Sequence, residues 1–91
     1  MHPALKDLLI TMINRRFIGG KHFPEDKLLH NKIKWIENDD RHQFEVEYNQ
    51  LVNQGIIIRQ KKRTGKGSSW HIWLNPSIVY DLKRQLFGDV R

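Results

Sequence analysis

Apolar residues recur every three or four positions in four parts of the chain, and this spacing predicts four amphipathic helices. The predicted helices span about residues 3–16, 24–36, 40–53 and 76–87. The pattern is clearest in the first helix, whose apolar face consists of Leu5, Leu8, Leu9, Met12 and Ile13. The third helix follows the same pattern with Phe44, Tyr48, Leu51 and Val52. Together these faces predict one hydrophobic core.

Residues that favour helix ends mark the limits of these segments. Pro24 fits the first turn of the second helix, where a missing backbone N–H costs nothing. Asp39 or Asp40 is a suitable N-cap for the third helix, and Gly55 is a suitable left-handed residue at its end. An Asn-Pro pair at residues 75–76 predicts the start of the fourth helix.

Between the third and fourth helices the pattern changes and predicts a β-hairpin over residues 56–74. Three β-branched residues open its first strand. In the second strand Trp70 shares a face with Ile72 and Leu74, so we interpret Trp70 as a core residue. Gly, Ser and cations fill the segment between the strands and predict a long basic loop. A further short strand is expected around residues 17–18.

Length and composition fit one small domain covering residues 1–91. Of the 91 residues, 38% are hydrophobic, which suffices for one core and leaves no room for a second domain. The chain has no cysteine, which excludes disulfides and thiolate metal sites and is compatible with a reducing cytoplasm. No apolar run approaches the roughly 20 residues of a membrane span, and the first residues lack the order of a signal peptide. We therefore expect a cytoplasmic protein.

The charge balance favours a polyanionic partner. Sixteen Lys and Arg against ten Asp and Glu give a net charge of +6 and a sequence pI near 9.9. This balance favours nucleic acid as the partner, with an anionic membrane surface as the second choice. Five of the cations fall within the predicted hairpin: Arg59, Lys61, Lys62, Arg63 and Lys66. We interpret them as an arm that contacts nucleic acid; the alternative is a solvated turn that keeps an edge strand soluble.

The predicted elements follow the order helix, helix, helix, basic hairpin, helix, and in this order the chain resembles the winged helix-turn-helix family. The resemblance covers about residues 5–87. It rests on the apolar pattern that leads into NQGIII and on the basic hairpin closed by WHIWLNP. It implies an α+β fold of three helices, a hairpin called the wing and an additional C-terminal helix, with the third helix as the recognition helix. The closing strand, Asn-Pro and helix are also similar to small plasmid or viral replication and copy-control proteins.

The third helix, which the resemblance makes the recognition helix, has a mainly neutral outer face. Its candidate base-contacting residues are Arg41, His42, Gln43, Val46, Asn49 and Gln50. Asn and Gln pair with adenine in the major groove, and Val contacts the thymine methyl group. Four carboxylates against one arginine give the segment a charge of −3, which disfavours approach to phosphates. An ordinary polar solvent face is therefore an equal alternative.

Two other helices carry candidate contacts. In the second helix, Lys27 and Lys34 fall opposite the apolar face and are candidates for additional phosphate contacts. In the fourth helix, Tyr80 and Phe87 lie opposite the core stripe and form a candidate surface for a homodimer. The alternatives are that these two residues are ordinary partly exposed aromatic residues or that they pack on the first helix. A dimer would suit a pseudo-palindromic DNA site.

No pattern in the chain indicates an enzyme, a cofactor or a metal site. The GKGS stretch at residues 65–68 lacks the earlier Gly and the Ser or Thr after Lys that a phosphate-binding loop needs. The five histidines have no ligand-like spacing, and no nucleophile, base and acid form a group.

We therefore predict a nucleoid-associated protein that binds double-stranded DNA, with sequence specificity or a structural preference. It would act as a transcriptional regulator or as a replication or copy-control factor. Two alternatives remain open. One is a winged-helix protein-interaction module whose basic wing docks on an acidic partner, and the other is single-stranded nucleic-acid binding through Trp70 and the wing.

Overall fold

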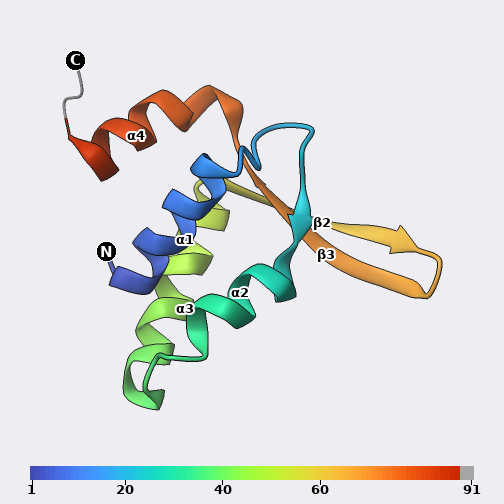
Figure 1. Ribbon diagram of the computed structural model, residues 1–91, viewed down its shortest axis with the longest axis horizontal. Coiled ribbons are helices and arrows are strands. Elements are labelled where there is room, and N and C mark those ends of the chain that lie inside the picture. Colours follow the sequence, from blue (N-terminus) through green and yellow to red (C-terminus); the bar gives the residue numbers. More distant parts are fainter. Residues whose placement is uncertain (89–91) are drawn as a thin grey trace.

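The computed structural model of the protein describes residues 1–88 and has an α+β fold with a winged-helix-like arrangement (Figure 1). The elements follow in the order α1 (Pro3–Asn14), β1 (Phe23–Pro24), α2 (Glu25–Ile33), α3 (Asn38–Asn53), β2 (Ile57–Thr64), β3 (Gly67–Leu74), a 3₁₀ turn (Pro76–Ile78) and α4 (Val79–Phe87). The β2–β3 hairpin follows α3 and projects away from the helices (Figure 1). The predicted fold class and the order of its elements are thus confirmed.

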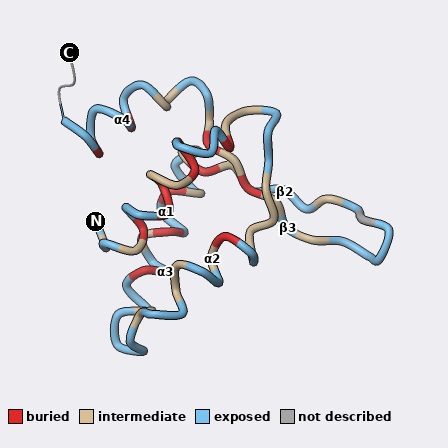
Figure 2. Tube along the Cα trace, in the orientation of Figure 1, coloured by how far each residue is buried: buried red, intermediate tan, exposed pale blue. Residues whose placement is uncertain are grey.

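The hydrophobic core is built around α1, which contacts α2, α3, α4 and β3. The five apolar residues predicted for its inner face are all buried, because residues three and four apart lie on the same side of a helix. The buried residues from the other elements include Leu28, Phe44, Tyr48, Leu51, Ile57, Ile72, Leu74, Leu82 and Leu86. Figure 2 shows that burial is concentrated in the helices and the inner part of the sheet, while the outer hairpin is exposed.

The sheet has three strands in the order β1-β3-β2, and both pairings are antiparallel. The short strand expected around residues 17–18 is only a single parallel bridge from Ile18 to Leu74. The third strand is β1, whose two residues pair with Ile72 and His71. Pro24 therefore ends a strand and caps α2, rather than lying inside the helix.

Two predicted helix limits in the helix-turn-helix region are wrong. The second helix ends at Ile33 rather than residue 36, because the chain turns there and the Ile36 N–H donates to the Ile33 carbonyl. The third helix starts earlier than predicted, and its N-cap is Glu37, whose carbonyl accepts from the N–H groups of residues 40 and 41. Asp39 and Asp40 therefore lie in the first turn, where carboxylates interact favourably with the helix dipole.

The ends of α1 and α3 have the same local geometry. After α3, Gly55 adopts a left-handed conformation, as predicted, and the Ile56 N–H donates to the Leu51 carbonyl. After α1, the equivalent left-handed position is held by Arg16, with a φ of 59°. The Phe17 N–H there donates to the Met12 carbonyl at 2.9 Å. Both helices thus end in a Schellman motif.

The hairpin differs from the prediction at its tip. Strands β2 and β3 continue almost to the end, and only residues 65 and 66 lie between them. The predicted long basic loop is therefore wrong, since most of the hairpin cations belong to β2. Five residue pairs extend beyond the Arg59–Ile72 pair, a length of roughly 17 Å at about 3.4 Å per residue.

Candidate nucleic-acid interface

Strand pairing distributes the wing cations over both faces of the hairpin. Residues directly opposite each other in an antiparallel pair share a face, and successive residues alternate between faces. Arg59, Lys61 and Arg63 therefore continue the face that carries the core residues Ile57 and Ile72 further in. Lys62 lies on the other face, with its amine 5.7 Å from the centre of the Trp73 ring. The wing therefore presents positive charge in two directions.

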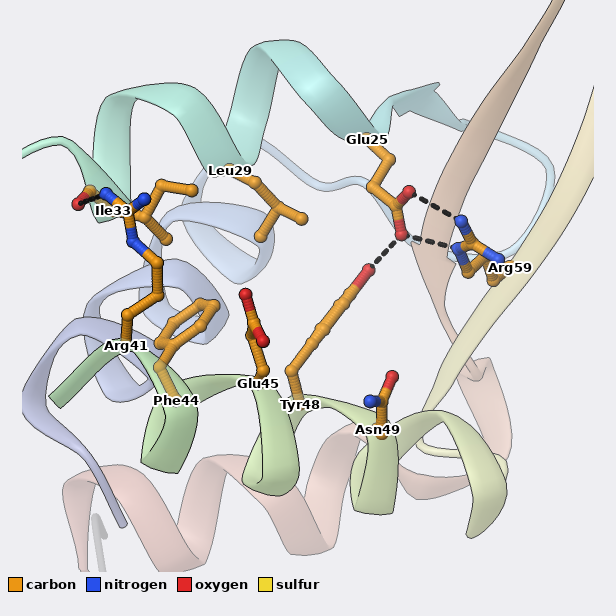
Figure 3. Close-up of a pocket in the computed structure, with 9 residues that line it drawn as sticks. All are labelled: Glu25, Leu29, Ile33, Arg41, Phe44, Glu45, Tyr48, Asn49 and Arg59. Atoms are coloured by element: carbon orange, nitrogen blue, oxygen red, sulfur yellow. Dashed lines mark hydrogen bonds and ion pairs between the residues drawn. The ribbon is translucent and has the colours of Figure 1, made fainter. Parts of the chain in front are cut away.

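Arg59 is bound to a carboxylate at the base of the wing. Its Nε lies 2.6 Å from Glu25 Oε2, and its Nη2 lies 3.0 Å from Glu25 Oε1 (Figure 3). The Tyr48 hydroxyl donates to the same Oε2 at 2.7 Å. This cluster joins the first residue of α2, the middle of α3 and strand β2. It fixes the wing relative to both helices of the helix-turn-helix.

The electrostatics of this cluster follow from its burial and pairing. Burial and then the hydrogen bond to Glu25 raise the pKa of Tyr48 well above its ordinary value, so the hydroxyl keeps its proton. The hydrogen bonds to Glu25 raise the pKa of Arg59. Glu25 is the common acceptor, with a side chain only 14% exposed. The charge of Arg59 is therefore already neutralised by Glu25 within the molecule.

Trp70 is exposed, which corrects its interpretation as a core residue. It shares a face with Ile72 and Leu74, as predicted, but its register places it opposite Lys61, beyond the edge of the core. Its relative exposure is 39%, and the Arg59 guanidinium lies over its ring at 3.9 Å from the centre. The alternation of residues along β3 predicted the face on which Trp70 lies. It did not predict that the core ends before Trp70, because that depends on the tertiary structure.

A groove of about 320 Å³ separates α2 from α3 and brings together three of the predicted contact residues (Figure 3). Arg41 lies at one end and Arg59 at the other, with Asn49 near Arg59. Leu29 and Phe44 are among its apolar lining residues. The Arg41 Nη2 lies 3.5 Å from the Ile33 carbonyl oxygen, which is a long hydrogen bond from α3 to α2.

The outer face of α3 is exposed, and part of it is engaged within the molecule. His42, Gln43, Val46, Asn49 and Gln50 are all exposed. The Gln43 amide donates to Glu47 at 2.8 Å, and Glu47 also accepts from the His2 backbone N–H. These hydrogen bonds lower the pKa of Glu47. Glu47 therefore holds the start of the chain against α3 and orients Gln43.

The remaining predicted residues lie at separate places on the surface. Lys27 is exposed on α2, and Lys34 lies just after that helix with its amine 5.4 Å from the Trp35 ring centre. Lys66 is exposed in the hairpin turn. On α4, Tyr80 and Phe87 are 73% and 46% exposed, as expected for the face opposite Leu82 and Leu86.

Glu25 and Tyr48 are the site residues that sequence reasoning did not find. Glu25 fits a helix start and Tyr48 fits an apolar helix face, so each was explained by its own helix. They are 23 residues apart in the chain, and no spacing rule joins them. A polar hydroxyl at a core position was the one available signal, because buried tyrosine hydroxyls usually find a partner.

Comparisons with protein-family models, with curated proteins and with solved structures found no match to this chain. Within residues 1–88, no three histidine or carboxylate side chains are grouped closely enough to hold a metal ion. Across the same residues, no helix combines the length and the apolar character that crossing a membrane requires.

Proposed function

We propose that this protein binds double-stranded DNA and acts as a cytoplasmic, nucleoid-associated transcriptional regulator or replication or copy-control factor. In this proposal the wing contacts phosphates and α3 lies in the major groove. No cofactor is required. The proposal is carried by the wing, a projecting hairpin whose charged residues are all cationic.

The composition of the wing supports a polyanion as its ligand. Residues 55–76 contain five Lys and Arg and no Asp or Glu. Lys61, Arg63 and Lys66 are exposed, and Lys62 is partly exposed. Cations this close repel one another, and contact with phosphates relieves that repulsion and releases counterions. Since Arg59 is bound to Glu25, we assign the phosphate contacts of the wing to its other four cations.

The wing and α3 have opposite charge, which assigns them different roles. With four carboxylates and one arginine, α3 is repelled by phosphates and contributes little to affinity. Its exposed amides offer the hydrogen bonds that distinguish bases, at Gln43, Asn49 and Gln50. In this scheme the wing supplies affinity for any sequence and α3 supplies the preference among sequences.

A salt titration of duplex binding tests the role of the wing. In the triple variant Lys61→Gln/Lys62→Gln/Arg63→Gln, we expect weaker binding to all sequences and a slope of log affinity against log salt that is smaller by about 2.7. A Gln43→Ala variant should change the preference among sequences and leave this slope unaltered. Circular dichroism confirms that each variant is folded. A wing variant that binds like the parent would rule out this function for the wing.

Two observations favour other ligands and define further arms of the same titration. The exposed Trp70, with Arg59 over its ring, is a surface on which a base of a single strand could stack. The exposed Asp39 and Asp40 in the first turn of α3 favour a protein-interaction module instead. Tighter binding to single strands than to duplex supports the first. Failure to bind any nucleic acid at low salt supports the second, in which the wing docks on an acidic protein.

A further inference from the structure

A shallow hollow of about 560 Å³ lies on the flank of α2 that faces away from the α2–α3 groove. It is bordered by the end of α1, by β1 and by the outer side of α2. Its polar lining includes Arg15, Lys27, His30 and Asn31, with Asp26 as the one carboxylate among its lining residues. The hollow is thus predominantly basic, whereas α3 on the other side of α2 carries a charge of −3.

Arg15, which lines this hollow, and Lys21, which lies outside its lining, contact the same aromatic ring. The Arg15 guanidinium lies 4.9 Å from the centre of the Phe17 ring and 5.1 Å from that of Phe23, which stacks on it. The Lys21 amine lies 5.7 Å from the same Phe17 ring. Within residues 1–88, no carboxylate is within ion-pair distance of either cation. The aromatic pair therefore orients positive charge that forms no ion pair with a carboxylate of the described residues.

Aromatic side chains connect this basic surface to the wing. Next to Lys21, His22 places its Nδ1 2.7 Å from Nδ1 of His71 on β3. The ring of His22 also lies 6.3 Å from that of Trp73, which contacts Lys62 on β2. A path of neighbouring side chains thus leads from Lys62 on the wing to Arg15 at the end of α1. The path follows the strand pairing of β2, β3 and β1 (Figure 1).

We propose that the surface formed by Arg15, Lys21 and Lys27 is a second phosphate-binding site, which contacts the backbone of the same duplex that binds the wing. This inference rests on the proposed function and adds a docking direction: the duplex that holds α3 in its major groove also extends across the sheet and the outer flank of α2, where its backbone contacts these cations. Charge complementarity selects a nucleic-acid backbone as the occupant, because the surface offers cations over a longer path than a single phosphate needs.

The double variant Lys21→Gln/Lys27→Gln tests this site without touching the core, since both side chains are exposed. We expect the salt slope of duplex binding to fall by about 1.8, so that between 50 and 200 mM salt the parent loses about tenfold more affinity than the variant. Lys6→Gln/Lys83→Gln, on α1 and α4, removes the same charge elsewhere and should retain most of the parent slope. Arg15→Gln, measured singly, should lower the slope by about 0.9.

The variant Lys61→Gln/Lys62→Gln/Arg63→Gln distinguishes failure of the second site from failure of the proposed function. If Lys21→Gln/Lys27→Gln keeps the parent slope while the wing variant loses its share, the second site does not exist and the proposed function stands. If the wing variant also binds like the parent, the proposed function is wrong, and the second site, which rests on that function, is wrong as well. Equal losses for Lys21→Gln/Lys27→Gln and Lys6→Gln/Lys83→Gln would mean that only net charge matters, which also overturns the second site.

Discussion

At the scale of single residues, Glu25 has a larger structural role than its position at a helix start suggests. Its carboxylate accepts from Tyr48 and from two nitrogens of Arg59. Removing it leaves a buried hydroxyl and a partly buried guanidinium with weaker partners. Arg59 also lies over Trp70, so loss of the Glu25 carboxylate also weakens the placement of Arg59 against Trp70 on the wing.

We expect Glu25→Gln to lower the free energy of unfolding by about 1–3 kcal/mol, since hydrogen bonds to a charged group are lost. The neighbouring Asp26→Asn removes the same charge from an exposed residue that has no contact with Arg59, and should change stability by less than about 0.5 kcal/mol. Urea denaturation measures both. Similar losses for the two variants would show that charge, rather than the cluster, sets stability.

We expect the His22–His71 contact to make the free energy of unfolding depend on pH. At 2.7 Å, one Nδ1–H donates to the lone pair of the other Nδ1, so the contact is lost if both rings are protonated. Partial burial, then His22 and Lys62, lower the pKa of His71, while Asp26 acts in the opposite sense. A lowered pKa favours the neutral ring in the folded state. The stability that His71 contributes is therefore fully present above the ordinary histidine pKa and is lost as the pH drops below it.

Urea denaturation across about pH 5 to 8, the range in which histidine titrates, tests this dependence. The parent should become less stable as the pH decreases, and His71→Gln should show a weaker decrease. His42→Gln, at an exposed position on α3 outside this pair, is the matched control. The same pH dependence in the parent and in His71→Gln would contradict the assignment.

At the scale of elements, the most informative comparison is between the ends of α1 and α3. Both use a left-handed residue, but α3 has Gly55 and α1 has Arg16. A side chain in this conformation costs roughly 1–2 kcal/mol, which glycine avoids at a smaller entropic cost. Arg16 is exposed, so little packing depends on its side chain.

Arg16→Gly should therefore raise the free energy of unfolding by up to about 1 kcal/mol, and Gly55→Ala should lower it by about 1–2 kcal/mol. Chemical denaturation of both variants checks the pair. Arg16→Ala keeps the conformational cost and isolates any contribution of the guanidinium. Loss of stability in Arg16→Gly without loss in Arg16→Ala would exclude a strained left-handed residue.

The sequence predicted those elements whose cause is local. The spacing of Leu5 to Ile13 predicted α1, and Gly55 predicted the end of α3, because periodicity and backbone freedom act within a few residues. The two-residue strand β1 was missed because it has no pattern of its own and exists only through pairing with β3. The exposure of Trp70 and the partnership of Glu25 with Arg59 were missed for the same reason, since each depends on distant residues.

At the scale of the whole molecule, the exposed aromatic residues of α4 bear on assembly. Tyr80 and Phe87 lie on the side of α4 opposite its buried leucines, so packing on α1 does not cover them. We propose that this face joins two copies, which would place two wings on one DNA site. Exposed aromatic side chains that gather on one face are typical of interaction surfaces.

Sedimentation velocity tests this assembly. The parent should sediment as a dimer and Tyr80→Ala/Phe87→Ala as a folded monomer, because both side chains are exposed in the single chain. Trp35→Ala removes an aromatic residue that is 81% exposed outside α4, and should remain dimeric. A monomeric parent at every concentration would exclude a dimer through α4.

The direct junction of β1 and α2 has a mechanical consequence. Strand β1 ends at Pro24 and α2 begins at Glu25, so no linker residue separates the sheet from the helix. The projecting hairpin is a lever, and β1, paired with the inner part of β3, lies near its pivot. We therefore expect force applied to the tip to reach α2 through β1, and α3 through the contacts of Glu25 with Arg59 and Tyr48. We expect a ligand that binds only the wing to rotate the helices together with the wing.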